Sequence, residues 1–487
     1  MDMELKDLKP QLVWKNFYSL TQIPRPSKKE VKAVEFLYDF GKSLGLETIK
    51  DEVGNIIIRK PATPGMEKRK GVILQGHIDM VPQKNADKVH DFEKDPIEAW
   101  VDGEWVRAKG TTLGADNGLG VAVAMSVLES KDLKHGPVEV LVTVDEETGM
   151  TGARALEPGI LKGDILINLD SETEGELYVG CAGGLDITAE LPYGTVPAPA
   201  HYRPYLLTVK GLKGGHSGMD IILYRANANK VMARVLLPLL RDMGVKLVSI
   251  DGGSLRNAIP REAFAQILVP EENVAGVTAC IGAVGEAVKS EYATTDPDIS
   301  VFATEQDDVP AGYMEDSAAL AAMRAVSGCP DGVWRMSDAV PGLVETSNNT
   351  AIVKSENGRL YVKTLMRSSV DTAKEAMAEQ ARAVFELAGF KVTFSGGYPG
   401  WAPNSSSPIL HTMKEVYRSL YGNEPAVMAI HAGLECGILG GAYPHWDMVS
   451  CGPTILSPHS PDERANVATV EKWWKFVTAT LENIPEK

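Results

Sequence analysis

Short apolar segments alternate with helix-like segments over the first 172 residues, and this alternation restricts the fold more than any other feature of the sequence. Three of the apolar segments, at 71–79, 138–147 and 164–172, have the length and composition of buried strands. The segment 117–130, between the first two, predicts a helix. Strands interleaved with helices favour a largely parallel sheet with helices on both faces, and therefore the α/β class.

Each predicted strand ends in histidine or acidic residues. Taken singly, such residues have ordinary explanations, because a histidine after a strand is more often a turn residue and an acidic run is usually solvated. Ligand sites in open α/β sheets, however, lie outside the carboxyl ends of the strands, where distant segments converge. The residues at these ends are His77 and Asp79 in the first strand, Asp145, Glu146 and Glu147 in the second, and Asp170 in the third.

Two further residues can join the same edge of the sheet. Asp116 precedes the predicted helix at 117–130, and His459 follows the last predicted strand. An aspartate at a helix start is usually a cap, so only the convergence of these segments favours a ligand role. Two histidines with three or four carboxylates suit a pair of zinc, cobalt or manganese ions.

Composition changes near residues 186 and 398, and we expect domain boundaries there. The segment 192–204 contains four prolines, and 396–408 is rich in glycine, proline and serine. Between the two boundaries a strand–helix alternation occurs twice, so the insertion at 186–398 is an α+β domain long enough for two α+β units. Residues 1–185 and 399–487 then form the two parts of one mixed, mostly parallel α/β domain.

The acidic composition argues against several functional classes. A net charge of −16 leaves no basic stripe of the kind that nucleic-acid binding requires. No apolar stretch reaches the roughly 18 residues of a membrane span, and no secretory signal is visible, so we expect a cytoplasmic protein without a membrane partner. The five cysteines are scattered and never in C-x-x-C spacing, which argues against a disulfide framework and a thiolate zinc site.

Six short motifs resemble those of the two-metal peptidases of the M20 clan, whose members include carboxypeptidases, aminoacylases and dipeptidases. In chain order they are GHIDMVP, GADNG, VDEETG, NLDSE, GGHSG and SPHSPDE. The long insertion and the segment NLDSETEGELYVGCAGG are similar to the aminoacyl-histidine dipeptidase branch of this clan. The resemblance covers nearly the whole chain and implies that the inserted domain is a lid over the catalytic domain.

The resemblance also implies a ligand set for two divalent ions, with zinc favoured and cobalt or manganese as alternatives. His77 and Asp170 would hold one ion, Glu147 and His459 would hold the other, and Asp116 would bridge them.

Catalytic roles follow from the same resemblance. Glu146 would be the general base that takes a proton from water and returns it to the leaving amine. Asp79 would accept the second ring N–H of His77, since residues two apart in an extended segment project to the same side. His216, in the inserted domain, would stabilise the oxyanion after domain closure.

Three further residues match substrate-binding positions of the family. Asn257 and Arg367 would bind the substrate carboxylate, for which the guanidinium fork of an arginine is well suited. Glu435, in the segment HAGLECG, would contact the substrate amine.

The sequence therefore predicts a metal-dependent dipeptidase that cleaves small unblocked dipeptides, including those with a C-terminal histidine such as carnosine. The alternatives are an aminoacylase or deacetylase of the same clan, and a metal-stabilised binding protein without turnover. Glu146, which need not be a ligand, disfavours the binding protein. A serine hydrolase is weaker still, because GHSGM lacks the G-x-S-x-G spacing. The sequence leaves open whether the chain forms a homodimer.

Overall fold

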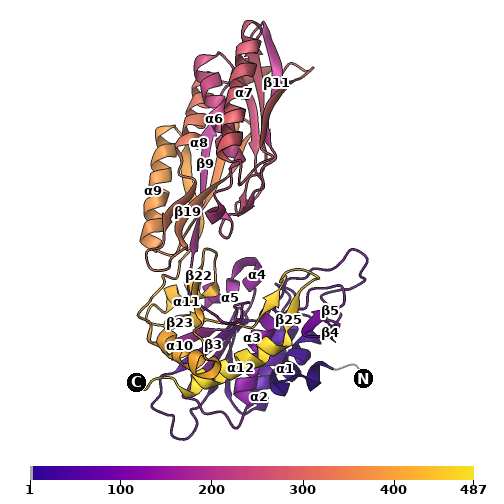
Figure 1. Ribbon diagram of the computed structural model, residues 1–487, viewed down its shortest axis with the longest axis vertical. Helices are drawn as coiled ribbons and strands as arrows, with labels where there is room; N and C mark the ends of the chain where they lie inside the picture. Colours follow the sequence, from indigo (N-terminus) through magenta and orange to yellow (C-terminus); the bar gives the residue numbers. More distant parts are fainter. Residues whose placement is uncertain (1–3) are drawn as a thin grey trace. The chain divides into compact units, whose positions relative to one another are not determined.

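The computed structural model describes residues 4–487 and divides into two compact units (Figure 1). Unit 1 comprises the chain up to Gly180, Pro403–Ala429 and Leu434–Lys487, and unit 2 comprises Cys181–Ala402 and Ile430–Gly433. The predicted insertion at 186–398 is shorter at both ends than the main segment of unit 2, because the backbones of Cys181 and Trp401 pair with each other inside that unit. The prediction also did not include residues 430–433, which belong to unit 2 although no change of composition marks them in the sequence.

Among the described residues, unit 1 is built on an eight-stranded sheet in the order β1-β2-β6-β3-β7-β23-β8-β22. Its four central strands, β6, β3, β7 and β23, run parallel to one another. This confirms the predicted α/β class with a mixed, mostly parallel sheet. The strands are β1 (Glu47–Lys50), β2 (Ile56–Lys60), β3 (Val72–His77), β6 (Val138–Thr143), β7 (Ile165–Asn168), β8 (Glu176–Cys181), β22 (Ala426–Ile430) and β23 (Asp447–Ser450).

The central strands are mostly apolar and almost fully buried, because helices cover both faces of the sheet. Leu74 and Val140 enter the main core, whereas their buried neighbours Ile73 and Leu141 point to the opposite face, since side chains alternate along a strand. On that opposite face, Gln75 binds Glu435 at the start of a helix. The helices of unit 1 are α1 (Gln11–Thr21), α2 (Val31–Ser43), α3 (Ala115–Glu129), α4 (Glu146–Gly149), α5 (Thr151–Ala155), α10 (Pro408–Tyr421), α11 (Glu435–Ala442) and α12 (Val467–Glu482).

The acidic segment after β6 differs from the predicted strand at 138–147. The strand ends at Thr143, and Asp145 has a left-handed backbone with a φ of 53°. Glu146 and Glu147 then begin α4. Successive side chains of a strand would point to opposite faces, whereas the first turn of a helix lets both carboxylates lie at the same edge of the sheet.

A small antiparallel sheet includes the two short strands that follow β23 in the chain. Its strand order is β24-β25-β5-β4, so the segment between β24 and β25 is held at both of its ends. This segment carries His459. The strands are β4 (Ala99–Asp102), β5 (Trp105–Ala108), β24 (Ile455–Leu456) and β25 (Arg464–Asn466).

Unit 2 contains an antiparallel sheet to which the described residues contribute nine strands, and four helices pack against it around one apolar core (Figure 1). The two predicted α+β units are therefore not separate, because β13 pairs with β19 and joins their strands into one sheet. The helices are α6 (Ala228–Asp242), α7 (Val274–Glu291), α8 (Asp316–Gly328) and α9 (Asp371–Leu387). The strands are β9 (Gly183–Pro192), β11 (Tyr202–Lys210), β13 (Lys246–Gly252), β15 (Ala263–Pro270), β16 (Ser300–Glu305), β18 (Gly332–Met336), β19 (Val344–Glu356), β20 (Arg359–Ser368) and β21 (Lys391–Tyr398).

Two short strand pairs complete unit 2: β10 (Thr195–Pro197) with β17 (Gly312–Met314), and β12 (Gly215–His216) with β14 (Ala258–Ile259). Over residues 4–487, no helix has the length and apolar character needed to cross a membrane.

Shortening one central side chain tests the packing of unit 1. We expect Leu74→Ala, at a fully buried position in β3, to lower the free energy of unfolding by roughly 2–5 kcal/mol, because it removes apolar contacts and leaves a cavity. Leu420→Ala in α10, where the side chain is 43% exposed, is the control and should change stability by less than about 1 kcal/mol. Urea unfolding measures both, and equal losses would contradict this description of the core.

Candidate metal centre

His77 and Asp79 occupy the carboxyl end of β3 and are both buried. The Nδ1 atom of His77 lies 3.3 Å from Oδ1 of Asp79, so this carboxylate can fix the orientation of the imidazole ring. The Asp79 carboxylate is itself held by backbone N–H groups, which Glu146 donates at 3.0 Å and Glu147 at 3.3 Å. The end of β3 is therefore tied to the acidic turn that follows β6.

Asp116 lies between His77 and His459. Its Oδ1 is 3.2 Å from Nε2 of His77, and its Oδ2 is 3.1 Å from Nε2 of His459. A second carboxylate faces each ring, since Asp170 lies 3.3 Å from His77 and Glu147 lies 3.0 Å from His459. The result is two adjoining groups of potential metal ligands that share Asp116.

The donor chemistry of both groups fits divalent metal ions. Each group offers one imidazole nitrogen and two carboxylates, a set that zinc and similar ions accept. Two buried oxygens lack a hydrogen bond in the described chain: Oε1 of Glu147 has no partner, and Oδ1 of Asp170 has only the 3.3 Å contact with Nε2 of His77. Buried carboxylate oxygens are costly without a partner, so these atoms favour a cation as the missing contact.

The electrostatics of the histidines point the same way. Burial lowers the pKa of His77, but Asp170, Asp116 and Asp79 together raise that pKa well above its ordinary value. Hydrogen bonds to Asp116 and Glu147 raise the pKa of His459 to about 11. Both rings therefore lie in fields that strongly favour a positive charge at Nε2.

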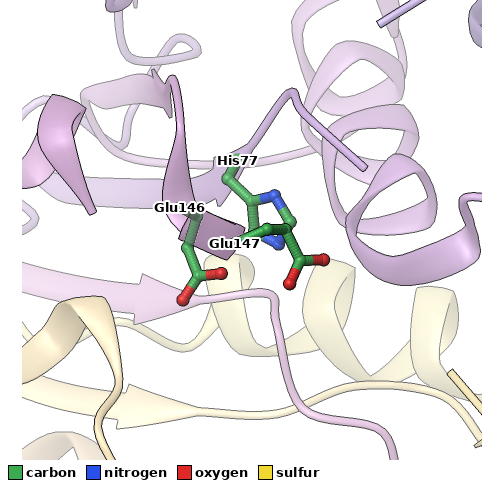
Figure 2. Close-up of side chains that lie close together, drawn as sticks. All are labelled: His77, Glu146 and Glu147. Atoms are coloured by element: carbon green, nitrogen blue, oxygen red, sulfur yellow. The ribbon is translucent and has the colours of Figure 1, made fainter. Parts of the chain in front are cut away.

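Glu146 differs from its neighbour because no histidine pairs with its carboxylate in the described structure. Figure 2 shows Glu146 and Glu147 on the same short helix beside His77, and ligand-type atoms of all three lie within 4.8 Å of one another. Burial and the nearby carboxylates, Asp170 among them, raise the pKa of Glu146 well above its ordinary value. Such a carboxylate binds a proton more readily than an exposed glutamate does.

Asp145, the first of the three consecutive acids, points into the protein and is 7% exposed. Its carboxylate accepts hydrogen bonds from the hydroxyls of Thr148 and Thr151, and its backbone N–H donates to Glu30. The three acids tolerate one another because each has a different environment: hydroxyl donors for Asp145, His459 for Glu147 and a raised pKa for Glu146.

Glu435 lies at the start of α11 and is almost fully buried. Its Oε2 accepts hydrogen bonds from Gln75 at 2.5 Å and Thr143 at 2.7 Å, whereas its Oε1 has no partner among the described residues. Burial raises the pKa of Glu435 to about 7. One oxygen is thus anchored to the sheet, and the other is left for a cationic group.

The remaining predicted site residues belong to unit 2. Arg367, in β20, donates from Nε to Ser217 at 3.3 Å and from Nη1 to Tyr398 at 3.2 Å. Asn257 is exposed, and its backbone carbonyl accepts the N–H of Ser217 at 2.8 Å. Ser217, the neighbour of His216, therefore contacts both Arg367 and Asn257.

His216 has a defined tautomer. Its Nδ1 accepts the backbone N–H groups of Gly218 and Met219 at 3.2 and 3.1 Å, so the ring proton of the neutral imidazole is on Nε2. Burial and the charge of Arg367 lower the pKa of His216, which keeps the ring neutral. The side chain can therefore donate one hydrogen bond from Nε2.

Sequence reasoning missed three buried residues close to these clusters: Arg25, His431 and Glu463. His431 lies in the quoted segment HAGLECG, and its Nε2 is 2.7 Å from Oγ of Ser347. Burial, with a contribution from Arg367, lowers the pKa of His431 to about 3. The only sequence signal for His431 and Glu463 was their place in the motifs HAGLECG and SPHSPDE, each of which contains a histidine and at least one acidic residue.

The fold and the clustered ligands define a class of α/β proteins with a two-part metal-type site at the carboxyl edge of the sheet. The model of peptidase family M20/M25/M40 matches residues 73–483, and the chain belongs to this family. The resemblance to the M20 clan is thereby confirmed.

Individual relatives agree with this assignment. The chain is 45% identical to the cytosol non-specific dipeptidase of Escherichia coli K12, over 99% of this chain and 100% of the relative. It is similar to the crystal structure of the aminoacylhistidine dipeptidase from Vibrio alginolyticus, with 47% identity, a TM-score of 0.95 and coverage of 100% and 99%. The aminopeptidase PepT from Bacillus cereus shares the fold at 16% identity, with a TM-score of 0.58 and coverage of 98% and 99%.

The buried His431 predicts a specific pH dependence of stability. Its pKa is about 3 in the folded protein against an ordinary value of 6.5, so below pH 6.5 the unfolded chain binds a proton that the folded chain does not. Stability is therefore lost as the pH falls from 6.5 towards 3, by roughly 2 kcal/mol between pH 6.5 and pH 5. Urea unfolding at pH 7 and pH 5 should show a smaller loss for His431→Gln than for the wild type. Equal losses in the two proteins would refute this role of His431.

Proposed function

We propose that the protein is a metal-dependent dipeptidase that hydrolyses unblocked dipeptides, including those with a C-terminal histidine. The observation that carries the proposal is the pair of ligand groups that share Asp116. The names of the relatives from E. coli and V. alginolyticus, both dipeptidases, support the choice of substrate. The name of the E. coli protein also supports a cytoplasmic location.

We assign the ligands as follows. His77 and Asp170 would hold one ion, His459 and Glu147 would hold the other, and Asp116 would contribute to both. Zinc suits these nitrogen and oxygen ligands, with cobalt or manganese as alternatives. When bound, such a pair polarises the scissile carbonyl and lowers the pKa of a water molecule.

Glu146 is the proposed general base. Its raised pKa makes it a stronger base than an exposed glutamate, so it can take a proton from water and return that proton to the leaving amine. Asp79 keeps Nδ1 of His77 protonated and thereby presents Nε2 to the ion. His216, whose Nε2 carries the ring proton, donates a hydrogen bond to the oxyanion.

Substrate recognition requires partners for both charged ends of a dipeptide. Arg367 and Asn257 are the proposed partners of the carboxylate, for which the guanidinium fork of an arginine is well suited. Glu435 is the proposed partner of the ammonium, since its Oε1 is buried and has no partner among the described residues.

An aminoacylase or deacetylase of the same family is the alternative function. An acyl group needs an apolar cup, whereas the buried Glu435 offers a carboxylate, and this difference favours a free amine. A binding protein without turnover would not need Glu146.

A matched substrate pair tests the proposal. We expect amino-acid release from a dipeptide such as Ala-His and little release from its N-acetyl analogue, because the acetyl group removes the cation that Glu435 would bind. The protein treated with a chelator is the control and should be inactive until a divalent ion is restored. Faster cleavage of the acetylated compound would instead favour the aminoacylase.

Glu146→Gln separates the base from the ligands. The variant should bind the same amount of metal as the wild type and lose roughly 10²–10⁴-fold in kcat, because it removes only a proton acceptor. Glu157→Gln, at an exposed position of unit 1, is the control and should retain full activity. Metal content by mass spectrometry decides the role: loss of an ion would make Glu146 a ligand, and an unchanged kcat would exclude it as the base.

A further inference from the structure

Arg25 is buried, at 1% exposure, in the segment between α1 and α2. Its Nη1 donates to the carbonyls of Ile78 at 2.8 Å and Asp79 at 3.3 Å, directly after the strand that carries His77. Its Nη2 donates to the carbonyl of Gly114 at 2.6 Å. One guanidinium group therefore links the end of β3 to the loop that leads to Asp116.

Glu463 is also buried, at 2% exposure, four residues after His459. Its two carboxylate oxygens accept four consecutive backbone N–H groups. These come from Leu113 at 2.7 Å, Gly114 at 3.0 Å, Ala115 at 2.8 Å and Asp116 at 3.2 Å. The loop that carries His459 is thus linked to the loop that carries Asp116.

Both links meet at Gly114, whose N–H binds Glu463 and whose carbonyl binds Arg25. Gly114 has a φ of 69°, and a Cβ atom there would lie 2.6 Å from Nη2 of Arg25. A Cβ atom at Gly118 would lie equally close to the same nitrogen. Two glycines therefore make room for the guanidinium group where the three segments meet.

We propose that Arg25 and Glu463 are positioning residues that fix the spacing of the metal ligands His77, Asp116 and His459. The inference rests on the ligands proposed above. Neither side chain provides a ligand itself. Each acts through backbone groups next to a ligand, and together they connect three segments that are far apart in the sequence.

The chemistry of the two side chains suits this task. A guanidinium group can donate to several carbonyls in a fixed plane, which the single ammonium of a lysine cannot reproduce. A carboxylate accepts at both oxygens, whereas a glutamine at position 463 would place an NH₂ group against two backbone N–H donors. Residues that orient metal ligands typically change metal affinity by about 10–100-fold when they are replaced.

A purely structural role is the competing explanation, and Glu139 provides a matched control. Glu139 is buried at the start of β6, and it accepts the backbone N–H groups of Lys162 at 2.7 Å and Gly163 at 2.8 Å. It also accepts Nε of Arg59 at 2.8 Å. Glu139 therefore has the same kind of partners as Glu463 but lies at the opposite end of the strand from the ligands.

The test measures Co²⁺ binding to the metal-free full-length protein by calorimetry and by the visible absorption of the bound ion. We expect Glu463→Gln to weaken Co²⁺ binding by roughly 10–100-fold and to shift the absorption, because the ligand geometry changes. Glu139→Gln should lower the melting temperature but leave Co²⁺ affinity and absorption unchanged. Arg25→Lys keeps the positive charge and should weaken Co²⁺ binding as Glu463→Gln does. If Glu463→Gln does not fold, the Co²⁺ affinity and absorption of Arg25→Lys test the proposal instead.

The proposal would be overturned if both Glu463→Gln and Arg25→Lys bound Co²⁺ with the affinity and the absorption spectrum of the wild type. So would an equal loss of affinity in Glu139→Gln, because the effect would then reflect general destabilisation. Failure of the wild-type chain to bind Co²⁺ would overturn the proposed ligands, and the positioning role with them. The two failures are distinguishable, because Co²⁺ binding by the wild type tests the proposed ligands, whereas the difference between the wild type and the variants tests the positioning role.

Discussion

The shared carboxylate of Asp116 is the interaction on which the rest of the site depends. It lies about equally far from two histidines, at 3.2 and 3.1 Å, and each histidine faces one further carboxylate. Several buried anions at one edge of a sheet repel one another unless positive charge lies between them. The parallel sheet brings the segments together, and the proposed ions would supply that charge. Asp79, Arg25 and Glu463 then hold the segments through backbone groups.

Much of the fold followed from pattern alone. The strands of unit 1 were predicted because strands buried on both faces are rich in apolar residues, as in 72–77 and 138–143, where every residue is buried. The end of β6 was predicted wrongly, since nothing in the sequence VTVDEETG marks the left-handed backbone of Asp145. The joining of the two α+β patterns of unit 2 into one sheet was not visible in the sequence, because strand pairing between β13 and β19 is a long-range contact that local periodicity does not record.

The candidate site was predictable to a different degree. Residues at the carboxyl ends of strands are visible in the sequence, and family motifs suggested their partners. The roles of Arg25 and Glu463 were not visible, because these roles depend on backbone groups that lie more than 50 and about 350 residues away in the chain. The tautomer of His216 is a similar case, since it is set by the N–H groups of a tight turn. Local patterns thus predict which side chains reach the site, and tertiary contacts determine how they are held.

The central claim is that two ions share Asp116, and anomalous diffraction from crystals grown with zinc tests it most directly. The account predicts two anomalous peaks per chain, separated by roughly 3.5–4 Å, with one oxygen of Asp116 bound to each. His77 and Asp170 should complete one site, and His459 and Glu147 the other. A single peak, or two peaks that do not share Asp116, would contradict the account.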